Sequence, residues 1–208
     1  MYMKESFLFA FLHRMKYIQR WGLMRNTEIE NIKEHSLDVA FIAHNLACIS
    51  NHYYGGHIDA NEVAVKAMFH DASEVFTGDM PTPIKYFNAT LRQLYGDIEK
   101  AAQHKLLETL PEPLQPDYEP LICEDATSAT GRFVKAADIL AAYMKCVREV
   151  HAGNDEFQEA HDSILAKLRA LDMPEVDLFL QLYSKPLSYS LDKLHYYHID
   201  SAKAKEDT

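Results

Sequence analysis

Apolar side chains recur every three or four residues along this chain, and this spacing constrains the fold more than any other feature. The first such segment places Phe7, Phe11, Met15 and Ile18 in register. Residues three and four apart share one face of an α-helix, so each segment predicts a helix with one buried face. No segment shows the strong alternation of apolar and polar residues that is typical of a half-buried strand. The spacing therefore favours an all-α fold.

Capping and breaking residues divide the chain of 208 residues into six or seven expected helices, a number that suits one compact bundle with a sizeable core. Ser6 and Asn61 are candidate N-caps, and His35 lies near the start of the second helix. Three polar or proline-rich segments, RWGLMRNTEIEN, TGDMPTP and PEPLQPDYEP, are expected to connect helices. The expected helices cover residues 6–18, 39–53, 61–72, 83–110, 128–150, 156–171 and 174–183.

Composition excludes several kinds of partner. The formal net charge of −10 disfavours binding to a nucleic-acid polymer, although a small phosphorylated substrate could still bind at a local cationic site. No segment approaches the roughly 18 apolar residues of a membrane helix, so no membrane partner is expected. The three cysteines, Cys48, Cys123 and Cys146, are odd in number and form no CxxC motif. Free thiols of this kind favour a reducing compartment, and we expect a cytoplasmic protein.

Two histidines and two aspartates form a candidate metal site. His70 and Asp71 are adjacent, His35 precedes them on another helix, and Asp138 lies on an apolar helix face. Two imidazoles and two carboxylates suit Mn, Fe, Co, Ni or Zn better than calcium. Taken singly, His35 could be a capping or packing residue, and Asp138 could pair with Lys135 one turn earlier. The ordered set from three helices is far more specific to a metal than any one member.

The order His35, His70-Asp71, Asp138 resembles the HD-domain metal-dependent phosphohydrolases. The segments RWGLMRN, EHSLDVA, HDASEVFTGDMPTPIKYF and KAADILAAYMKC closely resemble the bacterial HD-domain 5′-deoxynucleotidases. The resemblance extends over about residues 5–195 and implies a single HD domain over residues 1–208, with a flexible C-terminal tail. It implies hydrolysis of deoxyribonucleoside 5′-monophosphates, selectivity against ribonucleotides, and a homodimer. It also implies one divalent ion (Co, Mn, Zn, Ni, Fe or Cu) bound by His35, His70, Asp71 and Asp138.

Catalytic and substrate-binding residues follow from the same resemblance. Glu74 is the stronger acid/base candidate, and Asp79 is the second; on a continuing helix Glu74 would lie one turn from His70. Without the resemblance, the residue pattern favours an ordinary solvated helix glutamate at Glu74. The resemblance implies these substrate-binding residues: Arg20, Trp21, His35, Asp71, Asp79, Met80, Pro81, Thr82 and Asp138.

Residue chemistry leaves alternatives open near these positions. Arg20 could bind a phosphate, or it could cap the C-terminus of the first helix, while Trp21 could be a core residue. Glu28, Glu30 and Glu34 are interpreted as a solvated acidic run. Other functions compatible with the pattern are hydrolysis of a deoxynucleoside triphosphate or a cyclic nucleotide, or a non-catalytic helical interaction module. The pattern specifies neither the physiological metal nor the preferred base.

Overall fold

The computed structural model describes residues 5–85, 87–123 and 127–195. Within these ranges all regular elements are helices, and the only strand-like feature is an isolated bridge between Gln19 and Asn31. The all-α prediction is therefore confirmed. The α-helices are α1 Leu8–Arg14, α2 Ile32–Tyr53, α3 Ala60–Phe69, α4 Glu74–Thr77, α5 Thr82–Lys85, α6 Ala89–Leu107, α7 Gln115–Ile122, α8 Ala129–His151, α9 Gln158–Arg169 and α10 Pro174–Tyr183. The 3-10 helices are η1 Met15–Tyr17, η2 Glu112–Leu114, η3 Asp155–Phe157 and η4 Lys185–Ser188.

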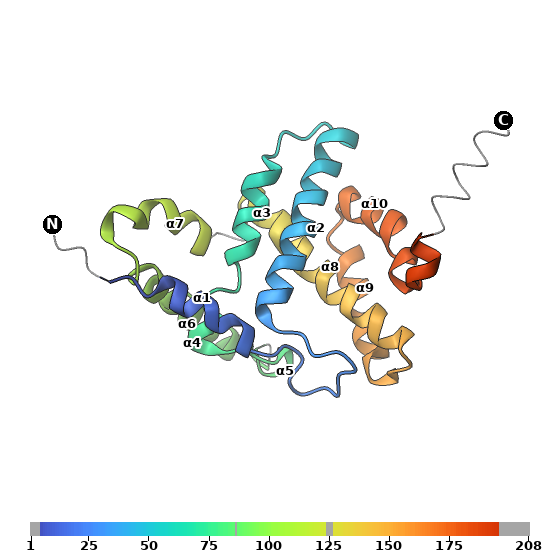
Figure 1. Ribbon diagram of the computed structural model, residues 1–208, viewed down its shortest axis with the longest axis horizontal. Coiled ribbons are helices and arrows are strands. Elements are labelled where there is room, and N and C mark those ends of the chain that lie inside the picture. The colour runs from blue at the N-terminus through green and yellow to red at the C-terminus, as the bar shows by residue number, and fades with distance from the viewer. Residues whose placement is uncertain (1–4, 86, 124–126, 196–208) are drawn as a thin grey trace.

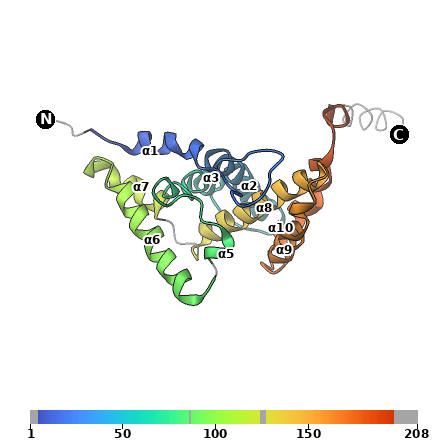
Figure 2. The ribbon, with the colours of Figure 1, turned by 90° about the horizontal axis from the view of Figure 1, so that it is seen from below.

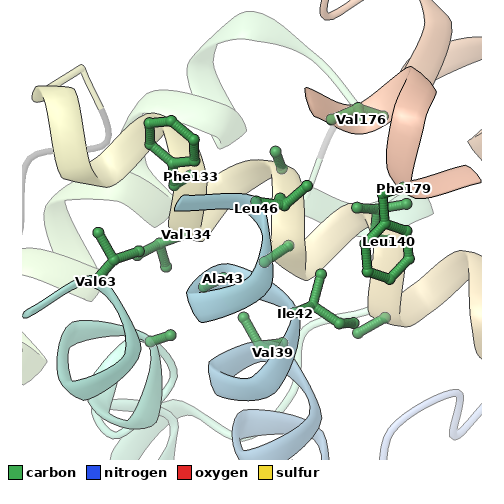
Figure 3. Close-up of a cluster of buried hydrophobic side chains, with 14 of the residues drawn as sticks. Val39, Ile42, Ala43, Leu46, Val63, Phe133, Val134, Leu140, Val176 and Phe179 are labelled. Atoms are coloured by element: carbon green, nitrogen blue, oxygen red, sulfur yellow. The ribbon is translucent and has the colours of Figure 1, made fainter. Parts of the chain in front are cut away.

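Helices α2, α3, α8 and α10 enclose the main core, with α2 at the centre of the molecule (Figure 1). Leu46 of α2 and Leu140 of α8 are completely buried in it. Figure 3 shows the side chains of these four helices converging. The labelled core residues are Val39, Ile42, Ala43, Leu46, Val63, Phe133, Val134, Leu140, Val176 and Phe179.

A second, smaller apolar cluster joins the N-terminal helix to α6 and α7. Its most deeply buried members are Leu8, Ile32, Ala72 and Leu106, which are 0% exposed. Figure 2 shows α6 and α7 on one side of the molecule and α9 and α10 on the other, with α2, α3 and α8 between them. No helix in the described ranges is long and apolar enough to cross a membrane. The expected flexible C-terminal tail begins beyond the residues that the structure describes.

Helix α2 begins seven residues earlier than the apolar spacing predicted. Asn31 caps it, because its side-chain oxygen accepts hydrogen bonds of 3.1 Å from the backbone N–H groups of Lys33 and Glu34. His35 is therefore in the first turn of the helix rather than before it. The predicted caps of two other helices are each displaced: Asp59 caps α3 in place of Asn61, and Phe7 precedes α1 in place of Ser6.

The third predicted helix ends earlier than expected, at Phe69. A tight turn follows, in which Ala72 N–H donates to Phe69 O over 2.9 Å and Glu74 N–H donates to Asp71 O over 3.0 Å. These bonds span three residues rather than four, so the chain leaves the α-helical path before α4 begins. The prediction that the helix extends to residue 72 is wrong by three residues, so no continuous helix joins His70 to Glu74, and the turn carries His70 and Asp71.

Two further expectations about loops and helices are corrected. Residues 83–110 form two helices, because Asn88 caps a new helix by accepting a 2.8 Å hydrogen bond from the Leu91 N–H. The proline-rich segment PEPLQPDYEP is largely helical, forming η2 and most of α7. Pro116 lies in the first turn of α7, where its missing N–H would have no partner within the helix. These breaks and additions explain why the described helices outnumber the six or seven expected.

Candidate metal centre and active site

The four predicted metal ligands come together from three parts of the fold. His35 lies in α2, His70 and Asp71 lie in the turn after α3, and Asp138 lies in α8. His35, His70 and Asp138 each offer a ligand atom within 4.8 Å of the others. Asp71 Oδ2 lies 3.0 Å from His70 Nε2 and 3.6 Å from His35 Nε2. The structure therefore brings His35, His70 and Asp138 together as one donor group, with the Asp71 carboxylate beside the two imidazoles.

The orientation of His70 favours a cation at that point. Its Nδ1 donates a 2.8 Å hydrogen bond to the backbone oxygen of Ala67, which leaves a lone pair on Nε2. This buried Nε2 has no hydrogen-bond partner within the described ranges, although it faces the Asp71 carboxylate. A nitrogen lone pair and a carboxylate oxygen 3.0 Å apart repel each other unless a cation or a proton lies between them.

The second imidazole, His35, is fully buried between two carboxylates. Its Nδ1 lies 3.3 Å from Glu30 Oε1, and its Nε2 lies 3.2 Å from Asp138 Oδ1. Burial and the charge of Arg20 lower the pKa of His35, but hydrogen bonds with Asp138 and Glu30 outweigh them and raise it to about 9. Two imidazoles and two carboxylates in this arrangement fit a single divalent transition-metal ion.

Glu30 is a functional candidate that the sequence analysis missed. It was interpreted as part of a solvated acidic run, yet it is only 7% exposed. Besides His35, it contacts Trp21, whose Nε1 donates a 3.1 Å hydrogen bond to Glu30 Oε2, and Arg20, whose Nε lies 3.8 Å away. A carboxylate behind a metal-binding histidine fixes the orientation of the ring. We therefore add Glu30 to the candidate site as a support for His35.

Arg20 reaches the same cluster from the segment after η1. Its Nη1 lies 3.5 Å from Asp71 Oδ2, and its side chain is 13% exposed. The alternative that Arg20 caps the first helix is wrong, since α1 ends at Arg14 and η1 at Tyr17. Arg20 thus supplies a positive charge beside the candidate ligands in a protein that is negative overall.

Trp21 adopts a strained backbone conformation next to Arg20. Its φ angle is +58°, a left-handed conformation that costs a non-glycine residue about 1–2 kcal/mol. Its indole packs against Phe157 with ring centroids 5.3 Å apart, while its N–H is bound to Glu30. The surrounding side chains must therefore offset the strain and hold this one ring orientation.

Two cavities meet at Asp138 and Lys135. The first, of about 310 Å³, opens beside Trp21, and the second, of about 290 Å³, opens beside Glu74. Most of the predicted substrate-binding residues line the first cavity, whereas His35 and Asp71 do not. Those that line it are Arg20, Trp21, Asp79, Met80, Pro81, Thr82 and Asp138.

Asp138 makes the ion pair with Lys135 that the sequence allowed and also faces the candidate ligand His35. Lys135 Nζ donates a 2.8 Å hydrogen bond to its Oδ2, as the structural alternative expected. Its other oxygen, Oδ1, faces His35 Nε2. Burial raises the pKa of Asp138, but Lys135 and His35 outweigh burial and hold it well below its usual range. The side chain is therefore an anionic donor toward the cluster.

The two predicted catalytic carboxyl groups face different cavities. Glu74 lines the second cavity, and Asp79 lines the first. Glu74 is not a solvated helix residue, since its Oε2 is buried with no hydrogen-bond partner in the described part of the chain. Burial raises the pKa of Glu74 well above its usual range, and the charges of Asp71 and Asp79 add to the effect. Burial raises the pKa of Asp79 as well.

An all-α domain in which a histidine, a His-Asp pair and a distant aspartate converge beside a cavity defines an HD-domain phosphohydrolase. Solved structures share this fold: an HD-domain phosphohydrolase from Listeria innocua matches with a TM-score of 0.75 and 23% identity, over 95% of this chain and 97% of that one. A cyanophage S-2L HD phosphohydrolase, DatZ, described as bound to dA and one catalytic Zn²⁺ ion, matches with a TM-score of 0.60 and 18% identity, over 91% of this chain and 100% of that one.

Sequence comparisons identify one family within the HD-domain phosphohydrolases. The family model described as "5′-deoxynucleotidase YfbR-like" matches residues 7–187. The 5′-deoxynucleotidase VV1113 of Vibrio vulnificus is 49% identical over 92% of this chain and 100% of its own length. The 5′-deoxynucleotidase YfbR of Escherichia coli O1:K1 is also 49% identical, over 92% of this chain and 97% of its own length. This chain belongs to the YfbR-like 5′-deoxynucleotidase family. The predicted enzyme class, a phosphoric monoester hydrolase acting on deoxynucleoside 5′-monophosphates, is thereby confirmed.

Proposed function

We propose that this chain hydrolyses deoxyribonucleoside 5′-monophosphates in preference to ribonucleotides, with one divalent transition-metal ion bound by His35, His70, Asp71 and Asp138. The observation that carries the proposal is the convergence of His35, His70 and Asp138, with Asp71 beside His70, next to a cavity that Arg20, Trp21 and Asp138 line.

The donor set supports Co, Mn, Zn, Ni, Fe or Cu as the ion, since imidazole nitrogens and carboxylate oxygens suit all of them. The cyanophage enzyme DatZ, which has a related fold, is described as bound to one catalytic Zn²⁺ ion. When bound, such an ion polarises phosphoryl oxygens and lowers the pKa of water, which supplies a nucleophile near neutral pH. Glu30 and the Ala67 carbonyl keep the His35 and His70 rings in position to bind it.

The nucleotide occupies the first cavity in this proposal. A volume of about 310 Å³ is at the small end of the range for ligand pockets, and it suits a single mononucleotide better than a longer substrate. The phosphate lies toward Arg20 and Asp138, where the guanidinium offsets the negative charge of the neighbouring carboxylates. The sugar and base lie against Trp21 and the segment from Asp79 to Thr82.

We attribute the selectivity for deoxyribose to the rigid position of the Trp21 indole, which forms one wall of the first cavity, here called the Trp21 wall. The indole is held on one side by Phe157 and at its N–H by Glu30, so it cannot move aside easily for an additional hydroxyl group. A ribonucleotide would place its 2′-hydroxyl against this wall without a hydrogen-bond partner. Steric clash and lost solvation of that hydroxyl then disfavour the ribonucleotide.

Glu74 and Asp79 divide the proton transfers between the two cavities. In an in-line displacement, water attacks phosphorus on the side opposite the leaving oxygen. With the nucleoside in the first cavity, that side is the second cavity, where Glu74 accepts the proton of the water. Asp79 donates a proton to the 5′ oxygen as the P–O bond breaks, so the products are a nucleoside and phosphate. Burial raises the pKa of both carboxyl groups, which suits Asp79 as a proton donor. A divalent ion at the neighbouring ligands would lower the pKa of Glu74 and leave it ionised, as a proton acceptor must be.

We also propose that the chain works as a homodimer in the cytoplasm. Leu37 and Phe41 lie one turn apart on α2 and are 47% and 65% exposed, an apolar pair that a second copy could cover. The three cysteines are free, as expected in a reducing compartment. Sedimentation of the wild-type protein and of Phe41→Glu tests the dimer: the wild type should sediment as two chains and the variant as one.

A substrate panel tests the proposed function. Phosphate release is measured from dAMP, AMP, dATP and a cyclic nucleotide, with Co²⁺, Mn²⁺ or Zn²⁺ added to chelator-treated protein. We expect rapid release from dAMP alone. Equal kcat/KM for AMP and dAMP would refute the selectivity, and faster turnover of dATP or of the cyclic nucleotide would favour a different HD-domain activity. Bound metal without any hydrolysis would favour an interaction module.

A further inference from the structure

A buried ion pair lies near the C-terminal end of α8, away from the candidate ligands. Lys145 and Glu149 are one helical turn apart and pair with each other. Each is only 1% exposed, which is rare for lysine and glutamate. Charged groups are buried in this way when several hydrogen bonds replace their lost solvation.

Those hydrogen bonds go to a short stretch of backbone in the segment that follows Trp21. Glu149 Oε2 accepts hydrogen bonds from the Thr27 N–H over 2.9 Å and from the Thr27 hydroxyl over 2.6 Å. Glu149 Oε1 accepts a 3.2 Å hydrogen bond from the Glu28 N–H. Lys145 Nζ donates to the Glu28 carbonyl oxygen. Glu149 therefore binds N–H groups of this loop, and Lys145 binds one of its carbonyl groups.

Asn154 extends this network toward the nucleotide cavity. Its Nδ2 donates to Glu149 Oε2 over 2.9 Å and to the Arg25 carbonyl over 2.7 Å. Within the loop, Asn26 Nδ2 donates to the Trp21 carbonyl over 3.2 Å. These hydrogen bonds, together with the peptide backbone between Arg25 and Asn26, thus link α8 to the backbone of Trp21, whose left-handed conformation needs such restraint.

The same helix also carries a candidate metal ligand. Asp138 precedes Lys145 by seven residues, about two helical turns, in the single uninterrupted helix α8. The Lys145 ammonium group lies 5.6 Å from the ring of Phe157, the side chain on which Trp21 packs. Helix α8 therefore sets the position of both Asp138 and the loop that carries the Trp21 wall.

We propose that Lys145, Glu149 and Asn154 are positioning residues, which together form a loop clamp that holds Trp21 at a set distance from the metal centre. None of the three lines either active-site cavity. By immobilising the indole, the clamp determines how strictly the cavity rejects a 2′-hydroxyl. This last step rests on the proposed function, whereas the immobilisation of Trp21 does not.

Fluorescence tests the immobilisation directly, because Trp21 is the only tryptophan in the sequence. Acrylamide quenching and the emission maximum are measured on metal-free protein for Glu149→Gln, Asn154→Ala and Thr27→Val. Each should show stronger quenching and a red-shifted emission than the wild type. Thr27→Ser keeps the hydroxyl donor to Glu149 and should restore the wild-type signal.

Glu175→Gln is the matched control. Glu175 is another buried glutamate, 8% exposed, and it accepts a 2.8 Å hydrogen bond from the hydroxyl of Ser50 in α2 rather than from the loop that follows Trp21. It should leave the Trp21 signal unchanged. If Glu149→Gln fails to fold, as circular dichroism would reveal, the other two variants decide the question. Wild-type quenching in folded Asn154→Ala and Thr27→Val would overturn the proposal.

The preference of the enzyme for dAMP over AMP provides a second test of the loop clamp. In Asn154→Ala and Glu149→Gln, the ratio of kcat/KM for dAMP to that for AMP should fall by about tenfold, mainly because the kcat/KM for AMP rises when the indole can move aside. A wild-type enzyme that treats AMP and dAMP alike would refute the proposed selectivity but leave the fluorescence result standing. A discriminating wild type whose variants keep the full ratio would overturn the positioning role.

Discussion

His35 Nε2 lies 3.2 Å from Asp138 Oδ1, although the two residues are 103 positions apart in the chain. This contact joins the first turn of α2 to the middle of α8, the two long helices that enclose the main core. Packing of that core therefore sets the geometry of the candidate metal centre. Asp71 and His70 complete the cluster from the turn after α3.

The first prediction concerns the metal ligands. His35→Ala should abolish binding of one divalent ion and reduce hydrolysis of dAMP by at least about 10²-fold, because a buried ligand of the site is lost. His44→Ala is the control, since His44 is an exposed histidine of the same helix. Metal content after dialysis and steady-state kinetics measure both effects. Equal metal content in the two variants would contradict the assignment of His35.

The second prediction separates the roles of Glu74 and Asp79. Either Glu74→Gln or Asp79→Asn should reduce kcat for dAMP by about 10²- to 10⁴-fold, since each removes a proton-transfer group. With p-nitrophenyl phosphate, whose leaving group needs no proton, Asp79→Asn should recover most of its loss and Glu74→Gln should not. Recovery by Glu74→Gln alone would reverse the two roles.

The third prediction is a pH dependence of stability that comes from Glu149. Burial raises the pKa of this carboxyl group, but hydrogen bonds from Lys145, Thr27 and Asn154 outweigh burial and hold the pKa well below its usual value of 4.5. A lowered pKa in the folded protein stabilises it above about pH 4.5, and this stabilisation is lost as the pH falls further.

Thermal unfolding of Glu149→Gln measures this contribution. At neutral pH the variant should have a lower Tm than the wild type, because the amide cannot replace the charge that Lys145 needs. The difference should shrink as the pH falls below about 4.5, since Glu149 of the unfolded wild type then takes up a proton that the folded protein does not, which favours unfolding. A Tm difference that stays constant down to acidic pH would rule out this role for Glu149.

The fourth prediction concerns the core. Leu46 is fully buried, and truncation to alanine should lower the free energy of unfolding by about 2–5 kcal/mol. Leu182, which is 45% exposed, should tolerate the same change within about 0.5 kcal/mol. Denaturant unfolding gives both values. Leu46 is about three helical turns from His35, so the kcat of folded Leu46→Ala should match the wild type.

Sequence patterns predicted some helices almost to the residue and misplaced others for identifiable reasons. Helix α10 begins at Pro174 and α8 follows the cap Ser128, because strong punctuation coincides there with clear apolar spacing. The break after Phe69 was missed, since residues 70–73 contain neither glycine nor proline. Helix α7 was missed for the opposite reason: its prolines indicated a loop.

Some residues of the candidate site could likewise be predicted from the sequence, and others could not. Its four candidate ligands were singled out as a set, because residue type and order along the chain were sufficient to suggest a metal centre. Glu30 could not be singled out, since nothing in its local pattern distinguishes it from Glu28 and Glu34. Its burial depends on the pairing of Gln19 with Asn31, which brings Glu30 beside Arg20. Lys145 and Glu149 were overlooked because contacts with a loop more than a hundred residues away decide their role.

Metal titration of chelator-treated protein tests the central claim most directly. Phosphate release from dAMP is followed as Co²⁺ or Mn²⁺ is added to the wild type and to His70→Ala. We predict that the wild type regains activity, that activity saturates at one ion per chain, and that His70→Ala stays inactive at every stoichiometric addition. Hydrolysis by the metal-free wild type, or full activity in His70→Ala with one ion per chain, would contradict the account.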